Sequence, residues 1–382
     1  MTDLSQLERQ ADQAAASGDL AGALKALEDA AAAGGSSVAL WTKLSAVRRA
    51  LGDVPGALAA VESALALAPL DFSALLARAM LLERSGDPRA GAAFAIAIAQ
   101  LPDDRDVPAA LSAAVDHARA RAAAHRDAVE QRLLATIPAT LGAGERSRLE
   151  RFASNTARRT RHFHQEPTDF HYPALPEIEF HDPSRFANMA GLEAATDAVR
   201  SEYEALVALK TAELVPYTQY PDHVPLAQWR ELNNNPDWTA IHLLRNGERV
   251  EANAAHCPAT LDLLSKLPQP KIPGAGPNAM FSLLAPRTRI PPHTGVANVR
   301  LVAHLPLIVP GGCGFRVGAT TIEWKAGKAI VFDDTIEHEA WNDSDELRVV
   351  LIFDLWAPAI GDSERDAVAK MISAAGVSFN GA

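Results

Sequence analysis

The chain has 382 residues, of which 48% are hydrophobic and 22% are charged, and its formal net charge is −11. This length is enough for two or three domains, and the composition is ordinary for a globular protein. The acidic balance argues against nucleic acid or an anionic membrane as the main partner, because both need a basic surface. We find neither an apolar run near the ~18 residues of a membrane span nor a secretory signal, so a cytoplasmic location is expected. The two cysteines, Cys257 and Cys313, form no CxxC pair and are expected to be reduced thiols.

The N-terminal third carries a repeat. Three glycine–aspartate pairs recur at intervals of 34 residues, namely Gly18-Asp19, Gly52-Asp53 and Gly86-Asp87. Each pair suits a tight turn, and the alanines that recur in phase around them let two helices approach closely. This period resembles the tetratricopeptide repeat, and three repeats are about the minimum for a stable stack. We therefore expect residues 1–102 to form tetratricopeptide-like helical repeats, which usually bind a peptide or a protein partner; a rigid spacer or dimerisation arm is the alternative.

Residues 103–165 are expected to form capping and connecting helices, because apolar residues recur there at roughly helical spacing. The stretch 167–183 is rich in proline, and each proline favours an extended preceding residue, so this stretch should wrap over a surface. The histidines in this region are His162, His164, His171 and His181. Their spacing fits no standard metal-ligand pattern, which disfavours a second metal site here. A single amphipathic helix is expected from Ala190 to Leu209.

From Asn278 onward, short strand-like segments alternate with glycine and proline turns, a pattern typical of an all-β sandwich or barrel. We expect this domain to span residues 166–360 and a C-terminal helix and tail to span 361–382. Strand alternation places Arg300, Val302 and His304 on one face, which indicates a lined pocket.

Two histidines in this domain have spacing that suits a metal site. His293 and His338 lie 45 positions apart. Neutral imidazole suits Fe, Zn, Cu and Ni alike, so two histidines alone do not identify the metal. The usual iron oxygenase triad adds a carboxylate in an HxD or HxE motif. Gly295 stands in that carboxylate position, so water would have to take the vacant coordination position.

Arg348 follows the second histidine by ten residues and would offer a bidentate fork to a dicarboxylate. Ser282 and His304 could add hydrogen bonds. A structural alternative is that Arg348 pairs with Asp354. Histidine ligands usually need hydrogen-bonding partners, and the sequence leaves three candidates unranked: Asp333, Asp334 and Glu339.

Several of these motifs together resemble one known family. They are Phe281-Ser282, Pro292-His-Thr-Gly295, Asn298-Val-Arg-Leu301, His304-Leu305, Gly327 to Asn342, and Arg348 to Pro358. They are similar to the aspartyl/asparaginyl β-hydroxylase family, and the resemblance spans roughly residues 170–358. It implies a double-stranded β-helix, a jelly-roll or cupin-like fold, in a dioxygenase that uses Fe(II), 2-oxoglutarate as cosubstrate, and O2. The family is known for a glycine at the position of Gly295, and its animal members carry tetratricopeptide repeats before the oxygenase domain.

The resemblance also implies residue roles. His293 and His338 would bind iron, with no catalytic side chain beyond these ligands. The cosubstrate would be held by Ser282, His304 and Arg348, with Arg300 near the pocket. Trp238 and Val302 would line the substrate pocket.

Val302 departs from the animal pattern, in which a second arginine grips the substrate carboxylate. Losing that charge-assisted contact would cost on the order of 2 kcal/mol or more. The expected function is therefore hydroxylation of a peptide or protein side chain (Asp/Asn-like) or a related small molecule, with a lipid-like acyl chain as an alternative substrate. Two other readings are a non-catalytic repeat-scaffold or cupin-like binding protein, and a zinc hydrolase, which the lack of a third protein ligand disfavours.

Overall fold

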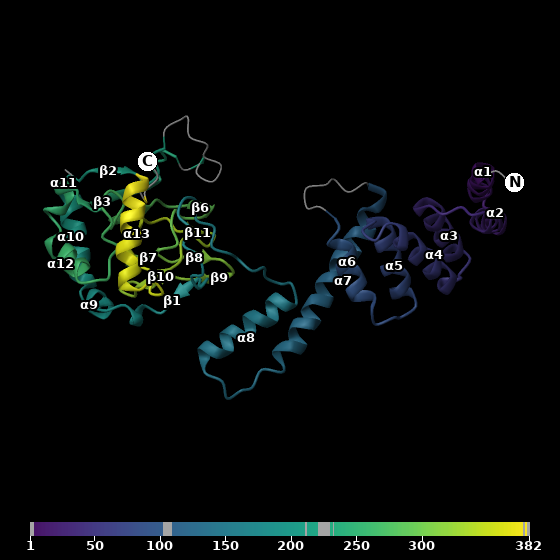
Figure 1. Ribbon diagram of the computed structural model, residues 1–382, viewed down its shortest axis with the longest axis horizontal. Helices are drawn as coiled ribbons and strands as arrows, with labels where there is room; N and C mark the ends of the chain where they lie inside the picture. Colours follow the sequence, from purple (N-terminus) through teal and green to yellow (C-terminus); the bar gives the residue numbers. More distant parts are fainter. Residues whose placement is uncertain are drawn as a thin grey trace. The chain divides into compact units, whose positions relative to one another are not determined.

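The computed structural model describes residues 4–101, 109–210, 212–220, 230–231, 233–376 and 379. The chain divides into two compact units, Met1–Arg161 and His162–Ala382 (Figure 1). Each unit is described by itself below.

The first unit is helical. Its paired helices are α1 (Leu4–Ala16) with α2 (Leu20–Ala32), α3 (Val38–Ala50) with α4 (Val54–Leu67), and α5 (Phe72–Arg84) with α6 (Ala90–Ile98). The longer α7 (Ala109–Leu134) and then α8 (Ala143–Thr156) follow. The glycine–aspartate pairs form the turns within each helix pair, as expected. Gly52 has a φ of +84°, which glycine adopts without strain, and Asp53 caps α4 by accepting a hydrogen bond from the Gly56 backbone N–H at 2.9 Å.

The second unit contains two antiparallel sheets. In the described residues, the larger sheet has the order β1-β10-β7-β12-β5-β3-β2, with β4 paired to β3, and the smaller has the order β6-β11-β8-β9. The strands of the larger sheet are β1 (Phe180–His181), β2 (Leu214–Pro216), β3 (Trp238–Arg245), β4 (Glu248–Arg249), β5 (Ala279–Leu284), β7 (Arg300–Ile308), β10 (Ile330–Phe332) and β12 (Arg348–Trp356). Those of the smaller sheet are β6 (Thr288–His293), β8 (Cys313–Val317), β9 (Thr320–Ile322) and β11 (His338–Asn342). This confirms the expected fold class, in which helical repeats are followed by an antiparallel jelly-roll domain.

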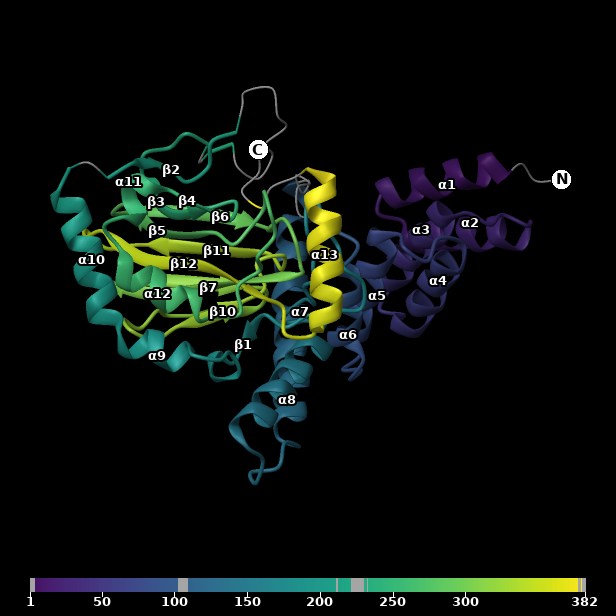
Figure 2. The ribbon, with the colours of Figure 1, turned by 60° about the vertical axis from the view of Figure 1, so that its left-hand side comes forward.

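Helices cover one face of the larger sheet (Figure 2). They are α9 (Met189–Ala194), α10 (Thr196–Ala208), α11 (Glu251–Ala254), α12 (Pro258–Ser265) and α13 (Asp362–Ala375), and a short 3-10 helix, η1 (Pro183–Arg185), precedes them. The prediction of a single helix from Ala190 to Leu209 is wrong, because α9 ends before Ala195 and α10 begins after it. There the Thr196 hydroxyl donates to the Glu193 carbonyl at 2.6 Å, a local bond that competes with helix continuation.

Alternation along the central strands separates two cores. Phe281 and Leu351 pack with the helices, whereas Met280 and Val350 point to the opposite face, into a second apolar cluster shared with the smaller sheet. The site described next lies in that second layer. Cys257 and Cys313 are free cysteines, and both are buried. No helix in the described residues combines the length and apolarity needed to cross a membrane.

Candidate active site

A cavity opens between the two sheets, lined by side chains from both. The residues expected from the sequence to hold the metal, the cosubstrate and the substrate all line it, together with Gly295: Trp238, Ser282, His293, Gly295, Arg300, Val302, His304, His338 and Arg348. Arg300, Val302 and His304 line it together because they alternate along β7.

The two histidines lie side by side on neighbouring strands of the smaller sheet. His293 ends β6 and His338 begins the antiparallel β11, where the two are paired in register, and their ring centroids lie 4.0 Å apart. His293 Nδ1 donates to the Pro291 carbonyl at 2.7 Å, and His338 Nδ1 donates to the Ile336 carbonyl at 3.1 Å. Each bond fixes the proton on Nδ1, so Nε2 carries the lone pair that a metal needs.

Burial keeps both rings neutral. It lowers the pKa of His293 to about 4, and it lowers the pKa of His338 well below the ordinary range, with His293 adding to the effect. A metal-binding histidine must be deprotonated, so the pair is ready for a metal at neutral pH.

Asp334 fills the space beside Gly295. A Cβ built on Gly295 would lie 2.0 Å from Asp334 Oδ2, and the Gly295 backbone N–H donates to the Asp334 backbone carbonyl at 2.7 Å. A carboxylate therefore stands where a side chain at position 295 would begin. Of the three acids left unranked by the sequence, Asp334 alone lines the cavity: Asp333 accepts from Thr335, and Glu339 pairs with Arg316.

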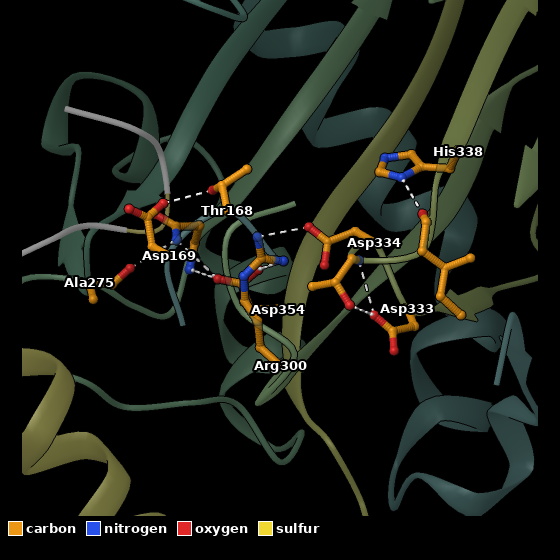
Figure 3. A network of polar contacts seen from close by, with 11 residues as sticks. Thr168, Asp169, Ala275, Arg300, Asp333, Asp334, His338 and Asp354 are labelled. Atoms are coloured by element: carbon orange, nitrogen blue, oxygen red, sulfur yellow. Dashed lines mark hydrogen bonds and ion pairs between the residues drawn. The ribbon is translucent and has the colours of Figure 1, made fainter. Parts of the chain in front are cut away.

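Arg300 lies between two carboxylates (Figure 3). Its guanidinium is 2.9 Å from Asp334 and 3.4 Å from Asp354, and all three side chains are buried. Burial lowers the pKa of Arg300, but the two carboxylates more than offset this, so the pKa rises. Burial raises the pKa of Asp334 to about 6 although Arg300 opposes the rise. Asp354 thus pairs with Arg300, and the alternative in which it pairs with Arg348 is wrong.

Arg348 has a different environment. It is 1% exposed, and among the described residues no carboxylate pairs with it. Its guanidinium lies 4.9 Å from the Trp324 ring centroid, and its Nε has no hydrogen-bond partner in the part of the chain that the structure describes. Burial lowers its pKa to about 10. A buried cation in this state costs folding free energy unless an anion joins it.

Polar groups gather near Arg348. Ser282 is paired in register with Val350 of β12, and its hydroxyl accepts from the Trp238 indole N–H at 3.1 Å. His304 Nδ1 is buried without a partner in the described structure, and burial, with a contribution from Arg348, lowers its pKa well below the ordinary range. A buried guanidinium with orphaned donors close by fits a carboxylate ligand.

The remaining wall is aromatic and apolar. Trp238 stacks on Tyr217 with centroids 3.8 Å apart and an angle of 10° between the rings, and it lies 6.3 Å from the His293 ring. Val302, Met280 and Ile290 complete this side. Sequence reasoning missed residues 217–220, which also line the cavity, because the segment carries no motif that ties it to the histidines.

Comparison with known proteins agrees with the earlier resemblance. Residues 193–358 match the family model described as aspartyl/asparaginyl beta-hydroxylase. Human aspartyl/asparaginyl beta-hydroxylase is 36% identical over 37% of this chain and 18% of its own length. The ornithine lipid ester-linked acyl 2-hydroxylase of Rhizobium tropici is 34% identical over 50% of this chain and 66% of its own. The chain therefore spans less than two thirds of either relative.

The solved structures that the chain matches have low sequence identity and low TM-scores, and several of them are described as cupin domains. A cupin 2 conserved barrel domain protein from Salinispora arenicola is 15% identical, with a TM-score of 0.22, over 40% of this chain and 99% of its own. A predicted oxalate decarboxylase from Thermotoga maritima is 14% identical, with a TM-score of 0.21, over 31% of this chain and 80% of its own.

Proposed function

Because residues 193–358 belong to the aspartyl/asparaginyl β-hydroxylase family, we propose that the protein is a 2-oxoglutarate- and Fe(II)-dependent hydroxylase. One observation carries the proposal: a neutral histidine pair with fixed tautomers shares a buried cavity with an arginine that has no acid partner among the described residues. When bound, Fe(II) with 2-oxoglutarate and O2 would supply the oxidation that replaces a substrate C–H bond with C–OH.

His293 and His338 would hold the metal through Nε2, since their Nδ1–H groups are committed to backbone carbonyls. Water would replace the carboxylate ligand that Gly295 cannot provide. Asp334, whose Oδ1 has no hydrogen-bond partner in the described structure, is positioned to accept a hydrogen bond from that water.

Arg348 would bind the far carboxylate of 2-oxoglutarate, helped by the Ser282 hydroxyl and His304. Such a bond between ionised groups is shorter and stronger than a neutral one, and burial strengthens it further by excluding water. The cosubstrate carboxylate would also remove the cost of the lone buried charge.

The geometry favours an acyl chain, or another uncharged group, as the part of the substrate near β7. Val302 is apolar, and Arg300 is already neutralised by Asp334 and Asp354, so the described residues of this face present no unpaired cation to a substrate carboxylate. The R. tropici relative is named for action on an ester-linked acyl chain, and the human relative for aspartyl and asparaginyl residues. We keep a peptide side chain as the second candidate, because the helical repeats of the first unit offer a surface for a protein partner.

An anaerobic titration with Fe(II) and then 2-oxoglutarate tests the proposal. We expect a metal-to-ligand charge-transfer band in the wild type, loss of the band in His338→Ala, and a greatly weakened response to 2-oxoglutarate in Arg348→Met. His181→Ala is the matched control, because His181 is a partly buried histidine on β1 that does not line the cavity. Absence of any 2-oxoglutarate binding in the wild type would refute the proposal. Mass spectrometry of acyl and peptide candidates, read for the gain of one oxygen, would then separate the two substrate classes.

A further inference from the structure

A second group of metal-ligand side chains lies outside the cavity, at the start of the second unit. Among the described residues, His162, His164 and Glu177 bring one ligand atom each within 4.8 Å of one another, and all three side chains are exposed. None of them lines the cavity between the sheets. The sequence did not predict a site here, because Glu177 lies 13 positions after His164 and only the fold brings their side chains together.

Alternation in an extended segment places the two histidines on the same side. Phe163, between them, packs against the apolar cluster of the two sheets, with the Arg316 guanidinium 5.6 Å from its ring centroid. The side chains of residues 162 and 164 consequently point the other way, out of the core. His171 and His181 do not join this group.

The neighbouring backbone fixes the carboxylate. The Gln165 backbone N–H donates to Glu177 Oε1 at 3.0 Å. Gln165 is itself anchored, because it forms an antiparallel bridge with Ile336 and its side chain accepts from Asn298 at 2.9 Å. Glu177 and His164 are therefore held by contacts that do not depend on a metal.

The spacing of the donor atoms suits a metal ion. Glu177 Oε2 lies 3.2 Å from His164 Nδ1 and 3.6 Å from His162 Nε2. Ligands bound to one zinc-type ion at about 2.0–2.2 Å lie roughly 3–3.6 Å from one another. In the described residues, the ion-pair partners of Glu177 are these two histidines, so no lysine or arginine competes with a cation.

We propose that His162, His164 and Glu177 form a surface site for a divalent transition-metal ion of the zinc class, separate from the His293 and His338 centre. Two imidazoles and one carboxylate suit Zn(II), Co(II) or Ni(II), whereas Ca(II) and Mg(II) prefer oxygen donors alone. Water completes the coordination. The ion ties residues 162–164 to residue 177, and it gives the 382-residue chain more than one metal equivalent.

Calorimetric titration of the metal-stripped 382-residue chain with Zn(II) tests this site. In a His293→Ala/His338→Ala background, which removes the cavity ligands, we expect one Zn(II) per chain. Adding His164→Ala, or the nearly isosteric Glu177→Gln, should weaken that binding by more than about tenfold, because even the outer partners of metal ligands contribute about 10–100-fold. His171→Ala, which removes a nearby exposed histidine outside the cluster, should leave it unchanged.

A second measurement avoids dependence on the cavity variant. With otherwise wild-type protein, Co(II) absorption should report one equivalent fewer in His164→Ala than in His171→Ala. Equal Co(II) stoichiometry in these two variants, or Zn(II) binding that is indifferent to Glu177→Gln, would overturn the proposal. Because these side chains are exposed, their replacement leaves the packed sheets intact.

Discussion

Replacing Gly295 by alanine should destabilise the sheet unit far more than one added methyl group would suggest. The new Cβ would lie 2.0 Å from Asp334 Oδ2 and 2.4 Å from its Cγ, so the carboxylate must move. Moving it breaks the buried ion pair with Arg300. Overpacking costs about 1–3 kcal/mol and breaking a buried pair about 3–5 kcal/mol, which together make about 4–8 kcal/mol. A typical domain has only about 5–15 kcal/mol of stability in total.

Urea unfolding followed by tryptophan fluorescence measures this loss. Five of the six tryptophans follow residue 161, so a Trp41→Phe background makes the signal report on the second unit alone. A loss of 4 kcal/mol should lower the unfolding midpoint by more than about 1 M urea. Gly191→Ala is the matched control, because its added Cβ has no atom within 4 Å.

Asp334→Ala removes every atom that clashes, and this supplies the decisive comparison. The double variant Gly295→Ala/Asp334→Ala should be no less stable than Asp334→Ala alone, a strong non-additivity expected of residues in contact. Simple addition of the two single effects, or a Gly295→Ala midpoint equal to that of Gly191→Ala, would refute the packing argument.

Three further predictions concern the cavity. Arg348→Met should raise the stability of the metal-free protein by about 1–3 kcal/mol, because it removes a buried charge that has no carboxylate partner among the described residues. The same change should weaken 2-oxoglutarate binding about 10–100-fold by calorimetry; a less stable variant would contradict the first expectation. Burial lowers the pKa of His242 in the folded protein to about 4. Between pH 6.5 and 4 the unfolded chain therefore binds more protons at this residue than the folded chain does. The free energy of unfolding should consequently fall by up to about 3 kcal/mol as the pH drops through this range. In urea titrations at several pH values, His242→Gln should reduce the dependence of the unfolding free energy on pH. An unchanged dependence would show that His242 is not its source. Val302→Arg should shift turnover toward Asp-bearing peptides, measured by mass spectrometry, because it adds a cation where Arg300 is already neutralised; unchanged selectivity would oppose the pocket argument.

Features set by local chemistry could be predicted from the sequence. Gly52 and Asp53 make their turn through contacts within a few residues, so a 34-residue spacing was enough to locate the helix pairs. Arg300 and His304 share the cavity face because alternation along a strand needs no knowledge of the strand's neighbours. The prediction of one continuous helix failed at Ala195, where the Thr196 hydroxyl donates a hydrogen bond to the Glu193 carbonyl and the helix is interrupted despite the apolar pattern.

Contacts set by strand register could not be predicted. Asp334 meets Gly295 from 39 positions away, and Asp354 pairs with Arg300 rather than with Arg348 because β12 and β7 align residues 354 and 302. Glu177 also meets His164 through the fold, with its carboxylate accepting a hydrogen bond from the Gln165 backbone N–H. The spacing of residues along the sequence cannot predict such contacts, because they depend on how the two sheets are assembled.

The contact between Gly295 and Asp334 also constrains how this site could evolve. A mutation that introduced a carboxylate side chain at position 295 would collide with Asp334 and would destabilise the protein. Shrinking residue 334 first would leave Arg300 with Asp354 as its remaining acid partner at 3.4 Å in the described structure. Both single-step paths pass through a less stable protein. Single substitutions are therefore not expected to place a carboxylate side chain at position 295, because Asp334 already occupies the space that its Cβ would need.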